Sequence, residues 1–231
     1  ANLTMALGYN RPDDIPITLS TVMQNIIDDK TLDVSQGIMH HSEGVDLLPS
    51  NIELSGFEVR LINAMSRERV LKTYVNEVKK NYDYVLIDCM PSLGMITINA
   101  LAAADSVIIP TQPHYLSAKG LELLLRSVSM VKRQINPKLR IDGILMTMVM
   151  PRTNISKEIT ATVKSAYGKK IKVFDTEIPH SIRAVEATAE GKSIFAYDKS
   201  GKVAAAYEQL GKEVAEIGEK QRNQNRADRL R

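Results

Sequence analysis

The segment from Tyr82 to Gly94, YDYVLIDCMPSLG, combines residue types that are typical of the Mg²⁺ side of a nucleotide site. Three consecutive apolar residues, Val85 to Ile87, predict a strand that is buried on both faces of a parallel sheet. Asp88 follows directly. A carboxylate at the end of such a strand lies on the rim where α/β proteins bind their ligands. We therefore predict that Asp88 faces a bound nucleotide.

A structural role explains Asp88 equally well when only the spacing is considered. An aspartate after a strand often closes a turn or caps the next helix, and a helix is predicted to begin near Ile96. The elements around Asp88 must therefore decide between these two interpretations.

Apolar strand patterns alternate with helical patterns along the chain, which is typical of an α/β protein with a mostly parallel, doubly wound sheet flanked by helices. The predicted strands are 45–49, 84–88, 106–110, 141–148 and 172–174. The predicted helices are 19–28, 66–80, 96–103, 117–135, 156–167 and 202–220. The last helix has an apolar face that is expected to pack on the sheet, formed by Tyr207, Leu210, Val214 and Ile217.

The length and composition favour one large domain. The chain has 231 residues, of which 44% are hydrophobic and 25% charged. We predict a single α/β domain over residues 1–217 and a basic polar tail over 218–231 that is solvated and frayed. The alternative interpretation is that this tail is an electrostatic arm that binds phosphates. It carries five cations: Lys220, Arg222, Arg226, Arg229 and Arg231. The formal net charge of +3 is too small to indicate nucleic acid by itself.

Several other classes of protein are disfavoured. No apolar run approaches the length of a membrane span and no signal peptide is recognisable, so a cytosolic protein is expected. Cys89 is the only cysteine, which excludes an intrachain disulfide and a cysteine-clustered metal site. Ser92 does not lie in the G-x-S-x-G motif of hydrolases. Four histidines lack partner ligands at metal spacing: His40, His41, His114 and His180.

Four collinear blocks of sequence resemble one family, the ParA/Soj partition ATPases of the deviant Walker P-loop group that includes MinD. The blocks are ANLTMALG, YDYVLIDCMPSLGMITINALAAADSVIIPTQPHYLSAKGLELLL, ILMTMVMPRTNISKEI and IPHSIRAVEATAEGKSIFAYDKSGKVAAAYEQLGKEV. The resemblance covers nearly the whole chain. It implies a P-loop NTPase fold of the deviant Walker type and an ATPase activity with ATP and Mg²⁺ as cofactors.

The resemblance also implies roles for residues around the predicted nucleotide. Asp88 matches the Walker B aspartate, a catalytic residue that holds Mg²⁺ through water. The loop that responds to the γ-phosphate matches Pro91, Ser92, Leu93 and Gly94. The adenine side matches Thr147 and Met148, with a loop at Pro179 and Ser181 closing over the base. Relatives often have Ile-Pro-Arg-Asn in that loop, and this chain differs by carrying His180 and Ser181.

The implied partners are nucleic acid and protein. Arg183, Lys199 and Lys202 match the basic patch with which dimers of this family hold nonspecific DNA. Such binding needs no contact with base edges, and it predicts a steep dependence on salt. The resemblance further implies an ATP-joined homodimer, a centromere-binding partner of the ParB type, and a cytoplasmic, nucleoid-associated role in chromosome or plasmid segregation.

One family motif is absent from these 231 residues. They contain neither G-x-x-x-x-G-K-[ST] nor its deviant form KGGxGKT, whose backbone N–H groups and lysine bind phosphate. The expectation is that a strand, phosphate loop, helix and strand would precede Ala1, and that these residues alone do not hydrolyse ATP.

The sequence bears on three alternative functions. A MinD-like division-site ATPase on membranes would need an amphipathic C-terminal helix, yet after Ile217 only Leu230 is strongly apolar. A relative of the nitrogenase iron protein would need two cysteines per subunit, and the chain has one. A nonenzymatic DNA-binding adaptor fits the missing phosphate loop, and this alternative stays open.

Overall fold

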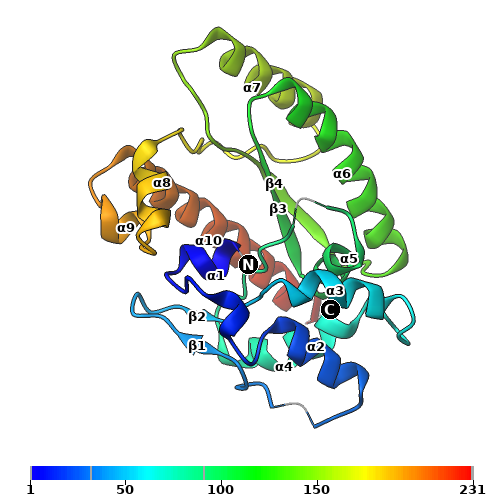
Figure 1. The fold of residues 1–231 in the computed structure, drawn as a ribbon. Helices are drawn as coiled ribbons and strands as arrows, with labels where there is room; N and C mark the ends of the chain where they lie inside the picture. The colour runs from blue at the N-terminus through cyan, green and yellow to red at the C-terminus, as the bar shows by residue number, and fades with distance from the viewer. Residues whose placement is uncertain (1, 32, 91, 230–231) are drawn as a thin grey trace. The chain divides into compact units, whose positions relative to one another are not determined.

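The parallel strands predicted in the middle of the sequence form in the computed structural model, which describes residues 2–31, 33–90 and 92–229. Strand β3 (Ser106–Thr111) pairs in parallel with β4 (Arg140–Met146), so that Ser106 lies opposite Arg140 and Thr111 opposite Met146 (Figure 1). Helix α6 (Tyr115–Gln134) lies between the two strands in the sequence, as a parallel connection requires. The α/β class predicted from the sequence is therefore confirmed.

The chain divides into two compact units, which are described separately. Unit 1 consists of Ala1–Asp105, Leu124–Leu139 and Ala187–Ser193. Unit 2 consists of Ser106–Leu123, Arg140–Glu186 and Ile194–Arg231.

Unit 1 is built mainly from short helices around a helical core. Its elements are α1 (Asn2–Ala6), η1 (Pro12–Asp14), α2 (Leu19–Ile27), the antiparallel strands β1 (Met39–His40) and β2 (Asp46–Leu47), α3 (Glu53–Leu61), α4 (Val70–Val78), η2 (Lys79–Asn81) and α5 (Met95–Ala103). Helix α4 buries five side chains at helical spacing: Val70, Leu71, Tyr74, Val75 and Val78. They form one core with buried residues of α2, α3 and α5.

Unit 2 places the strand pair against the C-terminal helix. Besides the two strands, unit 2 contains the helices α7 (Asn154–Tyr167), α9 (Ile194–Tyr197) and α10 (Lys202–Arg229). Helix α8 (Ile182–Ala189) begins in unit 2 and ends in unit 1. The fully buried ring of Phe174 packs with Leu145, Ile178 and Val203. Leu210, Val214 and Ile217 of α10 pack against this cluster, as predicted for the apolar face, whereas Tyr207 of the same face is exposed.

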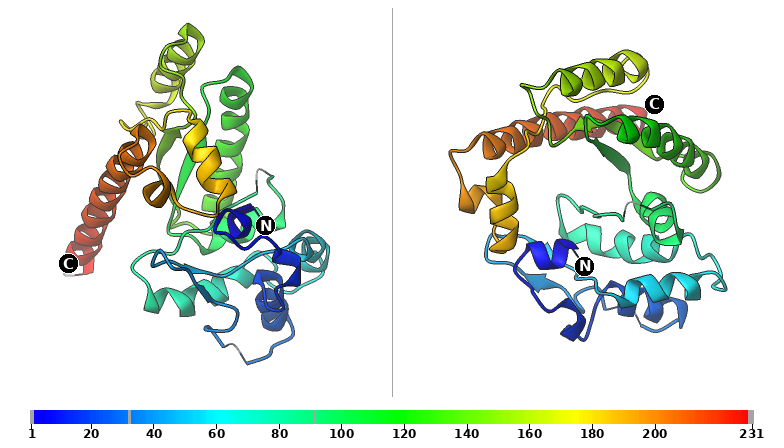
Figure 2. Two further views of the ribbon diagram at one scale, coloured as in Figure 1. Left: turned by 60° about the vertical axis from the view of Figure 1, so that its left-hand side comes forward. Right: turned by 45° about the horizontal axis from the view of Figure 1, so that its top comes forward.

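The C-terminal segment is helical beyond residue 220, where the last helix was predicted to end. Helix α10 continues without a break to Arg229, so the expectation of a frayed tail from residue 218 is wrong for 218–229 (Figure 2). Lys, Glu, Gln, Arg and Ala all favour helix, and charge does not prevent it. Gln221 also fixes this part of the helix to β4, because it accepts a hydrogen bond from Arg140 (2.6 Å) and donates one to Asp142 (3.0 Å). The domain end at residue 217 stays a prediction.

Two of the predicted strands do not form. Residues 84–88 are in none of the strands of the described chain, and the side chain of Leu86 is 89% exposed. A buried parallel strand needs hydrogen-bonded neighbours on both edges, and among the described residues no strand pairs with this segment. Residues 172–174 contribute only a single bridge, between Val173 and Ile144. Among the described helices, none combines the length and apolar character needed to cross a membrane.

Candidate nucleotide site

Asp88 lies in unit 1, near the end of the extended segment that leads to α5. Its carboxylate is exposed, whereas Ile87 before it packs partly against the core of the unit. Loss of water around the sulfur, and then the charge of Asp88, raise the pKa of the neighbouring Cys89 thiol. The thiol is therefore protonated at neutral pH, which leaves the carboxylate of Asp88 as the metal-binding candidate of this segment.

The loop after Asp88 is joined to the first turn of α5. Thr97 donates a hydrogen bond from its hydroxyl to the carbonyl oxygen of Ser92 (2.6 Å). The carboxylate of Glu58, from α3, lies against Gly94, so that a Cβ at position 94 would come within 1.9 Å of Oε1. Gly94 has a φ of −75°, so the backbone conformation does not require glycine, and a Cβ here would only require the flexible end of Glu58 to move. Pro91, predicted as part of the same loop, lies outside the described residues.

Two buried asparagines hold α5, Asn99 from the middle of the helix and Asn136 at its C-terminal end, and the sequence analysis missed both. Asn99 is fully buried; its amide oxygen accepts a hydrogen bond from the N–H of Leu71 (3.1 Å), and its amide nitrogen donates to the carbonyl oxygens of Arg67 and Met95. At the C-terminal end, Asn136 donates to the carbonyl oxygens of Leu101 (3.0 Å) and Ala104 (2.8 Å). The helix that follows Asp88 is therefore fixed in its unit.

The donor set around Asp88 suits Mg²⁺ better than a metal held by protein alone. Mg²⁺ keeps several waters and binds through one or two carboxylates together with phosphate oxygens. Asp88 provides one accessible carboxylate. No cluster of three or more His, Cys, Asp or Glu side chains that could hold a metal occurs among the residues that the structure describes. The residues present thus fit an ion that takes its other ligands from water and from a nucleotide.

The residues predicted for the adenine side lie in unit 2, where β4 ends. The N–H of Thr147 donates to the carbonyl oxygen of Thr111 (2.9 Å), which extends the β3–β4 pairing by one residue. Val149 then pairs with Pro179 in an isolated parallel bridge, in which its N–H donates to Ile178 (3.0 Å). The structure therefore brings the end of β4 and the loop at Pro179 together, as the site prediction requires.

Met148 and Ser181 differ in how free they are to contact a ligand. Met148 is exposed and has a φ of 53°, a left-handed conformation that is unfavourable for a residue with a Cβ. Strained residues of this kind are enriched at functional sites. Gln112 donates a hydrogen bond to the sulfur of Met148 (3.1 Å). The hydroxyl of Ser181, by contrast, accepts a hydrogen bond from the N–H of Arg183 at the start of α8 (3.2 Å). The hydroxyl of Ser181 therefore already binds the backbone of its own segment.

The three residues predicted to bind DNA are all exposed and all in unit 2. Arg183 lies on α8, Lys199 in the turn after α9, and Lys202 at the start of α10. The sequence analysis missed the acid beside them: Oε2 of Glu186 lies 3.5 Å from Nη1 of Arg183 and accepts a hydrogen bond from the hydroxyl of Tyr197 (3.1 Å). The hydroxyl of Tyr197 and the charge of Glu186 raise the pKa of Arg183 further above its usual range.

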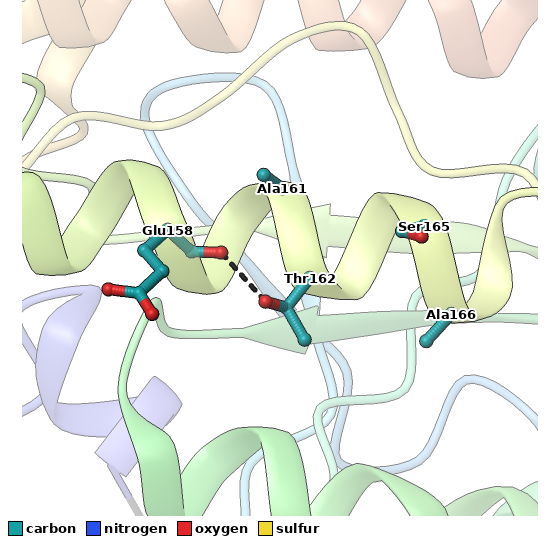
Figure 3. A pocket seen from close by; sticks show the side chains of 5 residues that line it. All are labelled: Glu158, Ala161, Thr162, Ser165 and Ala166. Carbon is teal, nitrogen blue, oxygen red and sulfur yellow. Dashed lines mark hydrogen bonds between the residues drawn. The ribbon is translucent and has the colours of Figure 1, made fainter.

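An open concavity on α7 is separate from these residues. It is lined by small and polar side chains of that one helix, and Figure 3 shows them side by side: Glu158, Ala161, Thr162, Ser165 and Ala166. The hydroxyl of Thr162 donates to the carbonyl oxygen of Glu158 within the helix (2.9 Å). None of the predicted site residues lines this concavity.

Comparison with known proteins gives the family. A family model described as an AAA domain matches residues 1–141. The chain is 40% identical over 218 residues to the sporulation initiation inhibitor protein Soj of Bacillus subtilis, which covers 94% of this chain and 83% of Soj. The chain belongs to the ParA/Soj family of partition ATPases. It is also 37% identical over 196 residues to the chromosome partitioning protein ParA of Myxococcus xanthus, covering 84% of this chain and 68% of that protein.

Solved structures support the fold of this ParA/Soj family member. Cobyrinic acid a,c-diamide synthase from Mycobacterium smegmatis, with bound ADP and magnesium, is 33% identical with a TM-score of 0.70, over 87% of this chain and 79% of that one. Apo McdA from Cyanothece is 21% identical, with a TM-score of 0.75 over 93% and 83% of the two chains, and it supports the fold alone. The predicted family and the α/β P-loop NTPase-like fold are therefore confirmed.

Proposed function

We propose that this protein is an ATP- and Mg²⁺-dependent ATPase that partitions chromosomal or plasmid DNA. The observation that carries the proposal is the 40% identity with Soj over 94% of the chain. A chromosome-partitioning ATPase Soj from Treponema pallidum, 42% identical over 167 residues, supports it as well. The cofactors are supported by the diamide synthase with ADP and magnesium, which is similar to this chain over 87% of its length.

The proposed nucleotide site has a metal side and a base side. Asp88 holds Mg²⁺ through water, and its exposed carboxylate is suited to this. Pro91, Ser92, Leu93 and Gly94 form the loop that responds to the γ-phosphate, and the helix that follows this loop is held in its unit by Asn99 and Asn136. Thr147, Met148, Pro179 and Ser181 line the adenine side.

Catalysis of phosphoryl transfer depends on positioning and on neutralising charge. Bound Mg²⁺ neutralises charge on the phosphate oxygens. Among the described residues of this chain, Asp88 orients that ion, and the loop up to Gly94 positions the γ-phosphate end. Hydrolysis also requires a glycine-rich phosphate loop, a motif that the sequence from residue 1 to 231 does not contain. We therefore propose that these 231 residues do not turn over ATP alone.

The proposed cycle couples the nucleotide to DNA. Two subunits joined by ATP hold nonspecific DNA through Arg183, Lys199 and Lys202, all of which are exposed. A centromere-binding protein of the ParB type stimulates hydrolysis and releases the DNA. The protein works on the nucleoid in the cytoplasm. Because the DNA contacts are ionic, affinity should fall steeply as salt is raised.

The Asp88→Asn variant of the complete gene product tests the nucleotide site. Its Mg²⁺-dependent hydrolysis should fall by at least about 100-fold, the scale on which loss of a preorganised electrostatic group lowers kcat. Asp83→Asn is the matched control, since Asp83 is exposed and five residues earlier in the same segment. Equal activity of the two variants would refute the role of Asp88. DNA binding by a complete gene product without any hydrolysis would favour the adaptor instead.

A further inference from the structure

An acidic side chain lies beside the guanidinium of Arg183. Oε2 of Glu186 is 3.5 Å from Nη1 of Arg183, one turn away on α8. The same oxygen accepts the hydroxyl proton of Tyr197, from α9, at 3.1 Å. Because Tyr197 donates to the same oxygen that faces Arg183, its hydroxyl helps to keep the carboxylate of Glu186 beside the guanidinium.

We propose that Glu186 restrains DNA binding by this protein, because its carboxylate holds the Arg183 guanidinium and a DNA phosphate must displace it. This inference rests on the proposed role of Arg183 in DNA binding. It adds a residue that sets the strength of that binding and so favours release of the DNA. Glu186 acts through Arg183, which makes it a positioning residue.

The exchange of carboxylate for phosphate is energetically feasible. The side chains of Arg183 and Glu186 are 64% and 45% exposed, and ion pairs between exposed side chains contribute little to stability. An arginine can bind phosphate through two parallel hydrogen bonds, which a single contact to one carboxylate oxygen does not match. A phosphate can therefore replace Glu186 without disturbing the core of the unit.

The charges around this site make a single acid important. Besides Glu186, Asp198 acts electrostatically on Arg183. Its carboxylate lies against Gly201, where a Cβ would come within 2.2 Å of Oδ2. In the sequence it immediately precedes Lys199. Arg183 thus interacts with two carboxylates, so that removing one of them halves the number of acids that act on its guanidinium.

The test is DNA binding by Glu186→Gln, a substitution that keeps the shape of the side chain and removes its charge. Affinity for a mixed-sequence duplex should rise about fivefold at low salt, from the interaction of two charges at about 4 Å in water. The plot of log affinity against log salt should steepen by up to about 1 per subunit, as one more phosphate contact is fully made. Glu208→Gln is the matched control, because Glu208 is exposed and pairs with Lys212 at 3.0 Å on α10.

Arg183→Ala separates this inference from the proposed function. If Arg183→Ala weakens DNA binding and Glu186→Gln leaves the affinity and salt slope unchanged, the restraint by Glu186 is wrong and the DNA-binding role stands. If Arg183→Ala itself leaves binding unchanged, the proposed role of Arg183 fails. Glu186→Gln should have little effect in the Arg183→Ala background. An equal gain there would mean a general charge effect and would overturn the inference.

Discussion

Replacing Asn99 with alanine should destabilise the part of the protein that carries Asp88. Asn99 is fully buried on α5 and caps another helix, because its amide oxygen accepts the N–H of Leu71 in the first turn of α4. The residue before that helix, Arg69, makes no capping hydrogen bond with its own side chain. Asn99 therefore supplies from α5 the capping bond that α4 lacks at its own N-terminus.

The expected cost of Asn99→Ala is about 3 kcal/mol in the free energy of unfolding. The substitution leaves the buried N–H of Leu71 without a partner, and an unsatisfied buried group costs about 1–3 kcal/mol. It also removes a donor from the carbonyl of Arg67, which costs less because Arg67 is exposed. The bond to Met95 lies within α5 and adds less. The shortened side chain also leaves a small cavity between α4 and α5.

Urea unfolding followed by circular dichroism measures this effect. Asn63→Ala is the control, since Asn63 is exposed and its replacement should change stability by less than about 0.5 kcal/mol. A loss below about 1 kcal/mol for Asn99→Ala would refute the idea that this side chain caps α4. An equal loss for Asn63→Ala would point to a general intolerance of substitution.

Three further predictions concern pH and packing. A hydrogen bond to Asp46, and to a smaller extent burial, raise the pKa of Tyr82 from 10.0 to about 12. The stability that this hydrogen bond adds is therefore present below pH 10 and is lost as the pH rises towards 12. In a tyrosinate absorbance titration, the Tyr82→Phe variant should lack the group that titrates near pH 12. Burial alone would raise the pKa of Glu213, but hydrogen bonds from Thr176 and Asp175 lower it overall, so its stabilisation is present at neutral pH and is lost as pH falls below about 4.5. Glu213→Gln should therefore be less stable by about 2 kcal/mol at neutral pH and less sensitive to acid in thermal melts. Gly191→Ala should cost about 2 kcal/mol or more in urea unfolding, because Gly191 has a φ of 65° and a Cβ there would lie 2.4 Å from the Cα of Gly8. Gly211 lies in open space on α10, so Gly211→Ala should stabilise the protein by up to about 1 kcal/mol. A change in the free energy of unfolding with the same sign for both variants would contradict this explanation.

Elements whose signal is local were predictable from the sequence. The parallel strands β3 and β4 and the helices α2, α5, α6 and α7 lie within a few residues of their predicted ranges, because their apolar patterns coincide with the structure they form. Strand 84–88 has an equally clear pattern but does not form, since a strand also depends on a neighbour that its own residues do not encode. Helix 66–80 begins only at Val70, after Ser66 adopts a φ of 51°.

Contacts around the candidate site could be predicted where the two residues are close in sequence, but not where they come from distant parts of the chain. The Arg183–Glu186 pair has the helical spacing of three residues and could have been found from the sequence, whereas Tyr197 reaches the same oxygen from another helix. Asn99 holds groups 28 and 32 residues away, and no local pattern indicates such a contact. Its polar side chain within an apolar helix was the available signal.

The contact between Glu58 and Gly94 links two positions that a comparison of sequences would treat as independent. A methyl group at position 94 is compatible with the backbone conformation and is excluded only by the carboxylate oxygen of Glu58. The restriction therefore lies at the end of a flexible side chain. Among relatives of this protein, side chains other than glycine at position 94 should therefore occur where residue 58 is shorter or where its flexible end can turn away.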